Sequence, residues 1–125
     1  MRTKDTREPC QKPKHVKYLA YADLAVEDLD WFLFHQSNRF IMKHLAKKCG
    51  IPEQKVPFVL EHFGNSGGAS VALAFTQGLP AVDRDASRVM ALGYGVGLSW
   101  GAAIVNLGAE TPLLHCNYSG AVARA

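Results

Sequence analysis

The stretch LDWFLFHQSN, residues 29–38, decides the fold class of this sequence. Its first six residues are nearly all apolar and rich in aromatic rings, which is typical of a strand buried on both faces of a helix-covered sheet. The run stops abruptly at the polar cluster HQSN, where Ser37 or Asn38 can cap a following helix. The stretch therefore predicts a buried strand, a polar turn and a helix start.

The segments on either side continue the alternation. Apolar residues at three- and four-residue spacing predict a helix over 14–25, and the helix after the polar cluster should run over 38–49 and end at Gly50. A short strand is expected at 58–62. A helix rich in small residues is expected at 69–75, and we expect it to be buried because small side chains permit close packing.

The last third of the sequence is expected to form a hairpin. A loop at 79–87 leads to strands at 88–93 and 98–107, which flank the glycine turn GYGVG, and a last strand is expected at 112–118. Alternating helices and strands followed by a hairpin predict an α/β fold, with a mixed sheet and helices packed on its faces.

Composition and charge exclude several functional classes. The 125 residues are 48% hydrophobic and 20% charged, an ordinary globular balance. Residues 1–13 are polar and broken by Pro9 and Pro13, so we expect a disordered basic head. Its basic residues are not interleaved with aromatic ones and form no known motif, so no nucleic-acid partner is expected.

The cysteines and the start of the chain indicate a cytoplasmic protein. Cys10, Cys49 and Cys116 are odd in number and lack metal-ligand spacing, so we expect neither a disulfide framework nor a metal site. No apolar run follows the first positive charges, and no stretch of about eighteen apolar residues exists, so neither a secretory signal nor a membrane span is expected.

Two polar clusters follow predicted strands, one at His35 and one at Asn65. Ligands of open α/β sheets bind outside the carboxyl ends of strands, so both residues could face one pocket. Alternatively, a backbone group satisfies His35, and Asn65 between glycines caps the next helix. The GYGVG run at 93–97 lacks dinucleotide-fingerprint spacing, and a strand follows it. Its backbone either faces a neighbouring site or forms a simple hairpin.

Together, HQSN at 35–38, GNSGGAS at 64–70 and GYGVGLSWG at 93–101 resemble the signature stretches of β-ketoacyl-acyl-carrier-protein synthase III, in the thiolase-like superfamily. Their order and spacing match the C-terminal half of that enzyme, over roughly residues 14–118. The resemblance implies that residues 14–125 form a partial thiolase-like half, the C-terminal portion of a condensing-enzyme domain.

The resemblance implies a Cys-His-Asn site for decarboxylative Claisen condensation in fatty-acid or polyketide-type synthesis. Its substrates would be acyl-CoA and malonyl-acyl-carrier protein, with no cofactor or metal. His35 matches the family histidine and Asn65 the asparagine, and their N–H groups would bind the malonyl thioester oxygen as it becomes an enolate. A neutral histidine suffices as such a donor. The backbone of Tyr94, Gly95 and Val96 matches a loop that helps form the oxyanion hole.

The resemblance also implies a carrier-protein surface. Asn38 matches a residue near the pantetheine arm, and family members dock the acidic acyl carrier protein on a basic surface of the helix that follows. Arg39, Lys43 and Lys47 share one face of that helix, and Lys47 and Lys48 match the family's basic positions. Charge alone favours the alternative, a solvated helix face, and electrostatic pairing with carrier protein there would mainly speed encounter.

No cysteine of the chain matches the family nucleophile, which lies in the N-terminal half. Cys49 closes the basic helix, where the helix C-terminus disfavours a thiolate. We expect the chain to need a cysteine-bearing half or homologous subunit, because strand 31–34 and the small-residue helix would expose apolar surface without it. The open alternatives are an inactive remnant that binds carrier protein or a subunit, and purely structural roles for His35 and Asn65.

Overall fold

The structure is a computed structural model that describes residues 14–79, 87–108, 111, 112 and 114. The predicted basic head, most of the loop at 79–87 and most of the strand predicted at 112–118 lie outside the described residues. The elements in chain order are α1 (Lys14–Tyr21), β1 (Trp31–Phe34), α2 (Arg39–Lys48), η1 (Glu53–Lys55), α3 (Leu60–Phe63), η2 (Gly67–Ala69), α4 (Ser70–Leu73), η3 (Ala74–Gly78), β2 (Arg88–Gly95), η4 (Val96–Leu98) and β3 (Ser99–Asn106).

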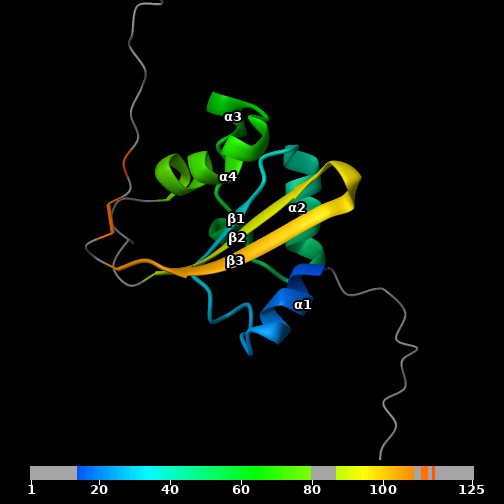
Figure 1. The fold of residues 1–125 in the computed structure, drawn as a ribbon, viewed down its shortest axis with the longest axis vertical. Coiled ribbons are helices and arrows are strands. Elements are labelled where there is room, and N and C mark those ends of the chain that lie inside the picture. The colour runs from blue at the N-terminus through cyan, green and yellow to red at the C-terminus, as the bar shows by residue number, and fades with distance from the viewer. Residues whose placement is uncertain (1–13, 80–86, 109–110, 113, 115–125) are drawn as a thin grey trace, which may run out of the picture.

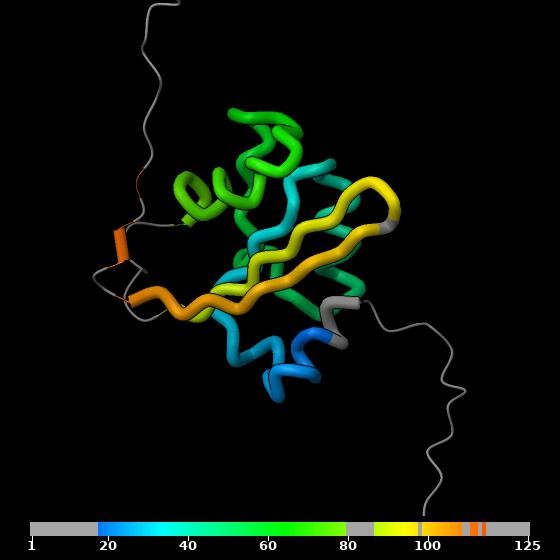
Figure 2. Tube along the Cα trace, viewed as in Figure 1, coloured from blue at the N-terminus to red at the C-terminus, as the bar shows by residue number. Residues whose placement is uncertain are grey.

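The three described strands form one mixed sheet in the order β1-β2-β3. β1 runs parallel to β2, with Trp31 opposite Val89, although the two strands are far apart in sequence. Figure 2 shows these segments side by side. β2 and β3 form an antiparallel hairpin in which Tyr94 lies opposite Trp100. The predicted mixed α/β class is therefore confirmed.

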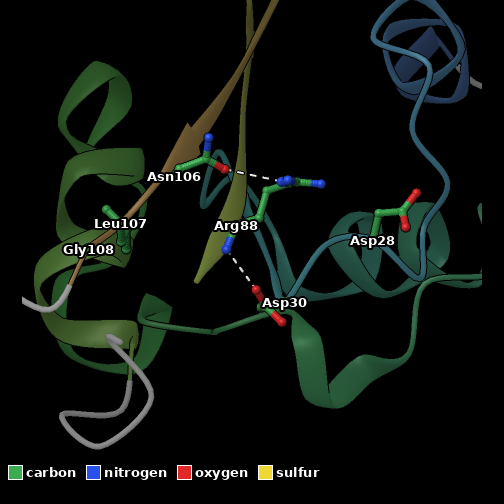
Figure 3. Close-up of a pocket in the computed structure, with 6 residues that line it drawn as sticks. All are labelled: Asp28, Asp30, Arg88, Asn106, Leu107 and Gly108. Carbon is green, nitrogen blue, oxygen red and sulfur yellow. Dashed lines mark hydrogen bonds between the residues drawn. The ribbon is translucent and has the colours of Figure 1, made fainter. Parts of the chain in front are cut away.

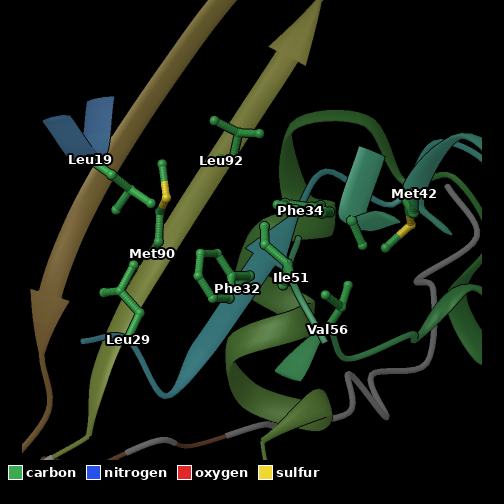
Figure 4. Packing of buried hydrophobic residues seen from close by; sticks show 10 residues of the cluster. Leu19, Leu29, Phe32, Phe34, Met42, Ile51, Val56, Met90 and Leu92 are labelled. Atoms are coloured by element: carbon green, nitrogen blue, oxygen red, sulfur yellow. The ribbon is translucent and has the colours of Figure 1, made fainter. Parts of the chain in front are cut away.

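Helices pack on both faces of the sheet, and the alternation of strand side chains explains why. Phe32 and Phe34 of β1 point to the same side as Met90 and Leu92 of β2, toward α1 and α2 (Figure 4). The buried residues of this cluster are Leu19, Leu29, Phe32, Phe34, Met42, Ala46, Ile51, Val56, Met90 and Leu92. Each large apolar side chain buried in this way contributes about 1.5–3 kcal/mol.

The opposite face of the sheet is covered by the segment that contains α4 and η3. Leu33 of β1 and Val89 of β2 pack there against Val59, Ala74 and Leu79. β1 is therefore enclosed on both sides, as its apolar sequence predicted. The carboxyl ends of β1 and β2 lie beside each other, which sets the position of the candidate site.

The strand predicted at 58–62 is wrong, because the chain forms the single-turn helix α3 there. The amide of Val59 donates to Gln36 Oε1, and the carbonyl of Pro57 accepts from Gln36 Nε2. A side chain thus satisfies backbone groups that a neighbouring strand would otherwise have to pair. An apolar run of three residues, Phe58 to Leu60, is too short to distinguish the two states.

Two expectations about burial are also corrected. The small-residue segment is not buried along its length, since only Ser70 and Ala74 are buried between residues 69 and 78. β1 exposes little, because Phe32, Leu33 and Phe34 are fully buried. The exposed sheet surface instead belongs to alternate residues of β3, which are Ser99, Gly101, Ala103 and Val105. The helices cover one face of β3 and leave this other face open.

Candidate active site

A pocket of about 490 Å³ opens at the carboxyl ends of β1 and β2. Its lining residues are His35, Asn65, Gly67, Gly68, Val71, Gly93, Tyr94, Gly95 and Val96. The structure thus brings together the predicted histidine, the predicted asparagine and the predicted loop of three residues. The volume is within the range of small-molecule sites.

Contacts of both its backbone and its ring hold His35 in place. The His35 amide donates to the carbonyl of Leu92 at 2.8 Å, which extends the β1–β2 pairing by one residue. Ring nitrogen Nδ1 lies 2.6 Å from Ser70 Oγ, and the ring meets Tyr94 edge-on, with centroids 5.0 Å apart. Nε2 has no hydrogen-bond partner among the residues that the structure describes. The partner of this histidine is therefore a side chain and not a backbone group.

Gln36 is a site-building residue that sequence reasoning missed. Its side chain is fully buried, and Nε2 donates to the carbonyls of Phe34 at 3.0 Å and Pro57 at 3.3 Å. Its Oε1 accepts from the amide of Val59 at 3.0 Å. The carboxamide thereby connects the end of β1 to the segment that leads to Asn65. A glutamine in a polar turn carries no sequence signal of such burial.

Asn65 follows a residue that must be glycine. Gly64 has φ 60° and ψ −159°, a conformation that is essentially restricted to glycine. The Oδ1 of Asn65 accepts a hydrogen bond from the amide of Gly67 at 3.2 Å. Because the carboxamide oxygen is engaged in this turn, the NH₂ group remains as the donor end of Asn65.

Tyr94 fixes the third wall of the pocket. Its ring stacks on Trp100 of β3 with centroids 4.9 Å apart, and its hydroxyl forms a hydrogen bond with Ser37 Oγ. Beyond it, Gly95 and Val96 are exposed, and Gly97 turns the chain with φ 76°. The turn after β1 and the carboxyl end of β2 are thus joined directly through side chains.

The family model of the 3-oxoacyl-[acyl-carrier-protein (ACP)] synthase III C terminal matches residues 19–107. The chain belongs to this synthase III family. The matched residues include the three motif stretches 35–38, 64–70 and 93–101, which line the pocket or lie beside it. It also covers every strand of the described sheet.

Relatives of known name agree with this membership. The β-ketoacyl-[acyl-carrier-protein] synthase III of Lactococcus lactis subsp. cremoris MG1363 is 35% identical over 100 residues, which cover 76% of this chain and 30% of the relative. The synthase III of Nostoc sp. PCC 7120 is 38% identical over 93 residues, which cover 74% and 28%. The chain therefore spans about 30% of the length of its synthase III relatives.

Solved synthase structures share the fold. The 3-oxoacyl-(acyl-carrier protein) synthase of Burkholderia xenovorans LB400 superposes with a TM-score of 0.70 at 39% identity, covering 77% of this chain and 28% of that one. The synthase III of Thermus thermophilus gives 0.69 at 29% identity, covering 78% and 31%. The three-stranded sheet and its helices thus match part of the thiolase-like fold of synthase III.

Half of the basic surface predicted on α2 of this synthase III chain is paired with carboxylates. Arg39 forms an ion pair with Glu61 at 2.6 Å, and Lys43 forms one with Glu53 at 2.6 Å. Both cations also lie over the ring of Phe58, at 5.4 and 5.9 Å from its centroid. Exposed pairs of this kind contribute about 0–1 kcal/mol each, so their main effect is local neutralisation.

The other predicted docking residues lie at the two ends of α2. Lys47 and Lys48 are exposed in the last turn, and neither forms an ion pair within the described ranges. Asn38 is the N-cap, and its Oδ1 accepts from the amide of Phe40 at 2.8 Å. Asn38 does not line the pocket, but its NH₂ group remains a donor.

Cys49, the only cysteine within the described residues, lacks the properties of a nucleophile. Burial raises the pKa of the Cys49 thiol to about 11, although the charge of Lys48 opposes the shift. The thiol donates to the carbonyl of Leu45 in the last turn of α2. The expectation that Cys49 is no acyl carrier agrees with this pKa, whereas Cys10 and Cys116 lie outside the described residues.

A second hollow, of about 630 Å³, lies at the opposite end of the strands (Figure 3). There the amide of Arg88 donates to Asp30 Oδ2 at 2.7 Å, and Arg88 Nε donates to Asn106 Oδ1 at 3.1 Å. These polar groups bond to one another and join the ends of all three strands. We therefore interpret them as structural.

The described ranges contain no cluster of three or more histidine, cysteine or acidic side chains that could hold a metal ion. Within the same ranges, no helix has the length and apolar character needed to cross a bilayer.

Proposed function

We propose that this chain is the histidine- and asparagine-bearing part of a β-ketoacyl-acyl-carrier-protein synthase III-like condensing enzyme. Joined to a cysteine-bearing half, it would catalyse decarboxylative Claisen condensation of an acyl thioester with malonyl-acyl-carrier protein. The observation that carries the proposal is the shared pocket of His35, Asn65 and the Tyr94–Val96 backbone.

The proposed chemistry places negative charge where this pocket has hydrogen-bond donors. As the bond between the malonyl carboxylate and the α-carbon breaks, CO₂ leaves and the electron pair moves onto the thioester oxygen. Imidazole and carboxamide N–H groups of His35 and Asn65 bind the resulting enolate. Loss of one such donor typically lowers the rate by about 10²–10³-fold.

The second step forms the new carbon–carbon bond. The α-carbon of the enolate attacks the carbonyl carbon of an acyl group held as a thioester on the cysteine of the other half. The backbone N–H groups around Gly95 and Val96 would stabilise the tetrahedral oxyanion, and its collapse releases the cysteine thiolate and the β-ketoacyl product. The acyl carrier protein would approach over Lys47 and Lys48, with its pantetheine arm near Asn38.

The experiment is complementation with a cysteine-bearing synthase III half. Malonyl decarboxylation and β-ketoacyl product are measured in the assembled complex for the unmodified chain and for His35→Ala and Asn65→Ala. We expect each variant to lose about 10²–10³-fold in rate, with assembly unchanged. Replacement of the exposed Gln54 by alanine is the control and should leave the rate unaltered. Full decarboxylation by both site variants would contradict the proposal.

The second candidate is an inactive partner that binds carrier protein or a homologous subunit. The observation that favours it is the chemistry of Cys49, whose raised pKa leaves the described residues without a reactive thiol. This candidate predicts carrier-protein binding with no turnover in any complemented complex. The same assay therefore separates the two functions.

A further inference from the structure

We infer that Ser70 fixes the proton of the neutral His35 ring on Nδ1, so that Nε2 is left as a hydrogen-bond acceptor at the pocket. Ser70 is then a positioning residue that acts through His35. Ser70 is fully buried, lies at the start of α4 and is not part of the pocket lining.

The inference follows from counting protons around one oxygen. Ser70 Oγ lies 3.2 Å from the amide of Gln36, which can only donate. The hydroxyl donates its single proton to the carbonyl of Gly67 at 2.8 Å. The third neighbour is His35 Nδ1 at 2.6 Å, and the hydroxyl has no second proton to give it. The contact is a hydrogen bond only if Nδ1 carries the proton.

The opposite orientation of the hydroxyl fits less well. If Ser70 donated to Nδ1, its oxygen would face the carbonyl oxygen of Gly67 at 2.8 Å with no hydrogen between them. Two oxygens with lone pairs directed at each other repel at that distance. With Nδ1 protonated, the Ser70 oxygen accepts two hydrogen bonds and donates one, which uses its full capacity in a buried position.

This protonation state assigns an order to the roles of His35. Because Nδ1 already carries the proton of the neutral ring, Nε2 can only accept a proton. Nε2 carries an N–H only in the imidazolium ion, in which Nδ1–H still donates to Ser70 Oγ. The thiol of the other half would supply this proton and become the thiolate that attacks acyl-CoA. The CoA thiolate that leaves on acylation then takes its proton from water, so His35 keeps Nε2–H as the donor for the decarboxylation step. This reading rests on the proposed function, and it differs from the neutral donor expected from sequence.

The test is the ¹⁵N spectrum of the histidine ring in the full 125-residue chain. It is recorded at about pH 8, above the ordinary imidazole pKa of about 6.5. Long-range ¹H–¹⁵N correlations distinguish protonated from unprotonated ring nitrogens, and His35→Gln identifies the His35 signals by their loss. We expect protonated Nδ1 and unprotonated Nε2. The reverse pattern overturns the inference, whatever the Ser70 variants show.

Two Ser70 variants separate the hydroxyl from the fold. Ser70→Ala removes the acceptor of Nδ1–H, so we expect the ring to move to the Nε2–H form that imidazoles favour in water. Ser70→Thr keeps the hydroxyl and should keep Nδ1–H. An alanine variant that retains Nδ1–H would overturn the inference.

The failure of the proposed function would look different. In the complemented complex, absence of malonyl decarboxylation together with the expected ring signals contradicts the function and leaves the role of Ser70 intact. Malonyl decarboxylation together with a neutral ring protonated at Nε2 supports the function and contradicts the role of Ser70.

Discussion

The imidazole of His35 meets the phenol ring of Tyr94 edge to face, with centroids 5.0 Å apart and ring planes at 87°. His35 follows β1 and Tyr94 lies in the last turn-side residues of β2, so this contact joins the turn after β1 to the carboxyl end of β2. The hydroxyl of Tyr94 adds a hydrogen bond to Ser37, in the same turn as His35. The pocket thus depends on one aromatic side chain for the relative placement of two of its walls.

Replacing Tyr94 by phenylalanine should separate the two contacts. The ring stays against His35, whereas the bond to Ser37 is lost at a cost of about 0.5–1.5 kcal/mol of unfolding free energy. Ser37→Ala should cost a similar amount, and the double variant should cost little more than either one. Urea unfolding of the three variants measures this coupling. Strictly additive losses would show that the two hydroxyls act independently.

Gln36→Leu should be among the most destabilising changes near the site. Leucine fills a similar volume but leaves the amide of Val59 and the carbonyl of Pro57 buried without the partner that Gln36 supplies. Each orphaned group costs about 1–3 kcal/mol. The exposed Gln54→Leu is the matched control and should change the unfolding free energy by less than about 0.5 kcal/mol. Equal losses of unfolding free energy in the two variants would contradict a stabilising role for the hydrogen bonds of Gln36.

The sequence predicted those parts of the fold whose signals are local. β1 follows from an unbroken apolar run, and α2 follows from the cap at Asn38 and the stop at Gly50. The strand expected at 58–62 was wrong because the backbone there pairs with the side chain of Gln36. That partner lies 23 residues from Val59, and no local pattern encodes it.

In the candidate site, too, the sequence predicted the residues that belong to local motifs and missed those whose partners are distant in the chain. His35, Asn65 and the Tyr94–Val96 loop were identified from motifs, and they share one pocket, while their catalytic roles remain predictions. Gln36 and Ser70 were missed because a buried polar residue reads like an exposed one until its partners are known. Pairing of Arg39 with Glu61 was equally out of reach, since 22 residues separate them.

Gly64→Ala should destabilise the chain and displace Asn65. A Cβ at φ 60° and ψ −159° is strained even though no neighbour lies within 4 Å of its position, and such strain costs about 1–3 kcal/mol. Gly68→Ala also meets open space, but its φ is not positive, so it should be nearly neutral. Thermal unfolding compares the two, and equal melting temperatures would contradict the strain.

The thiol of Cys49 should react slowly in the folded chain. Burial raises its pKa to about 11, so the acid form persists through neutral pH and only about a thousandth is thiolate near pH 8. In a Cys10→Ser, Cys116→Ser background, iodoacetamide should label Cys49 much faster in urea than in buffer. The rate in buffer should rise with pH up to about 11. Equal labelling in both solutions would contradict the shift.

The proposed carrier-protein surface makes a prediction about charge. Lys47→Gln with Lys48→Gln should slow association with acyl carrier protein and weaken its dependence on salt, because steering scales with unpaired charge. Arg39→Gln with Glu61→Gln removes an ion pair at constant net charge, so it should leave the association rate unchanged. Stopped-flow measurements of the association rate at several salt concentrations test this prediction. An association rate that does not change in the double lysine variant would contradict a docking role for Lys47 and Lys48.

The parallel pairing of β1 with β2 also affects how the chain folds. Asp30 and Arg88, whose backbones bond at the start of this pairing, are separated by 58 positions, whereas β2 and β3 are neighbours in sequence. A hairpin closes in about 1–10 μs, but contacts between distant segments form more slowly. We therefore expect His35 to reach Tyr94 late in folding, after a stage in which Phe32 and Phe34 are exposed to water. Apolar rings exposed in this way promote association between incompletely folded chains.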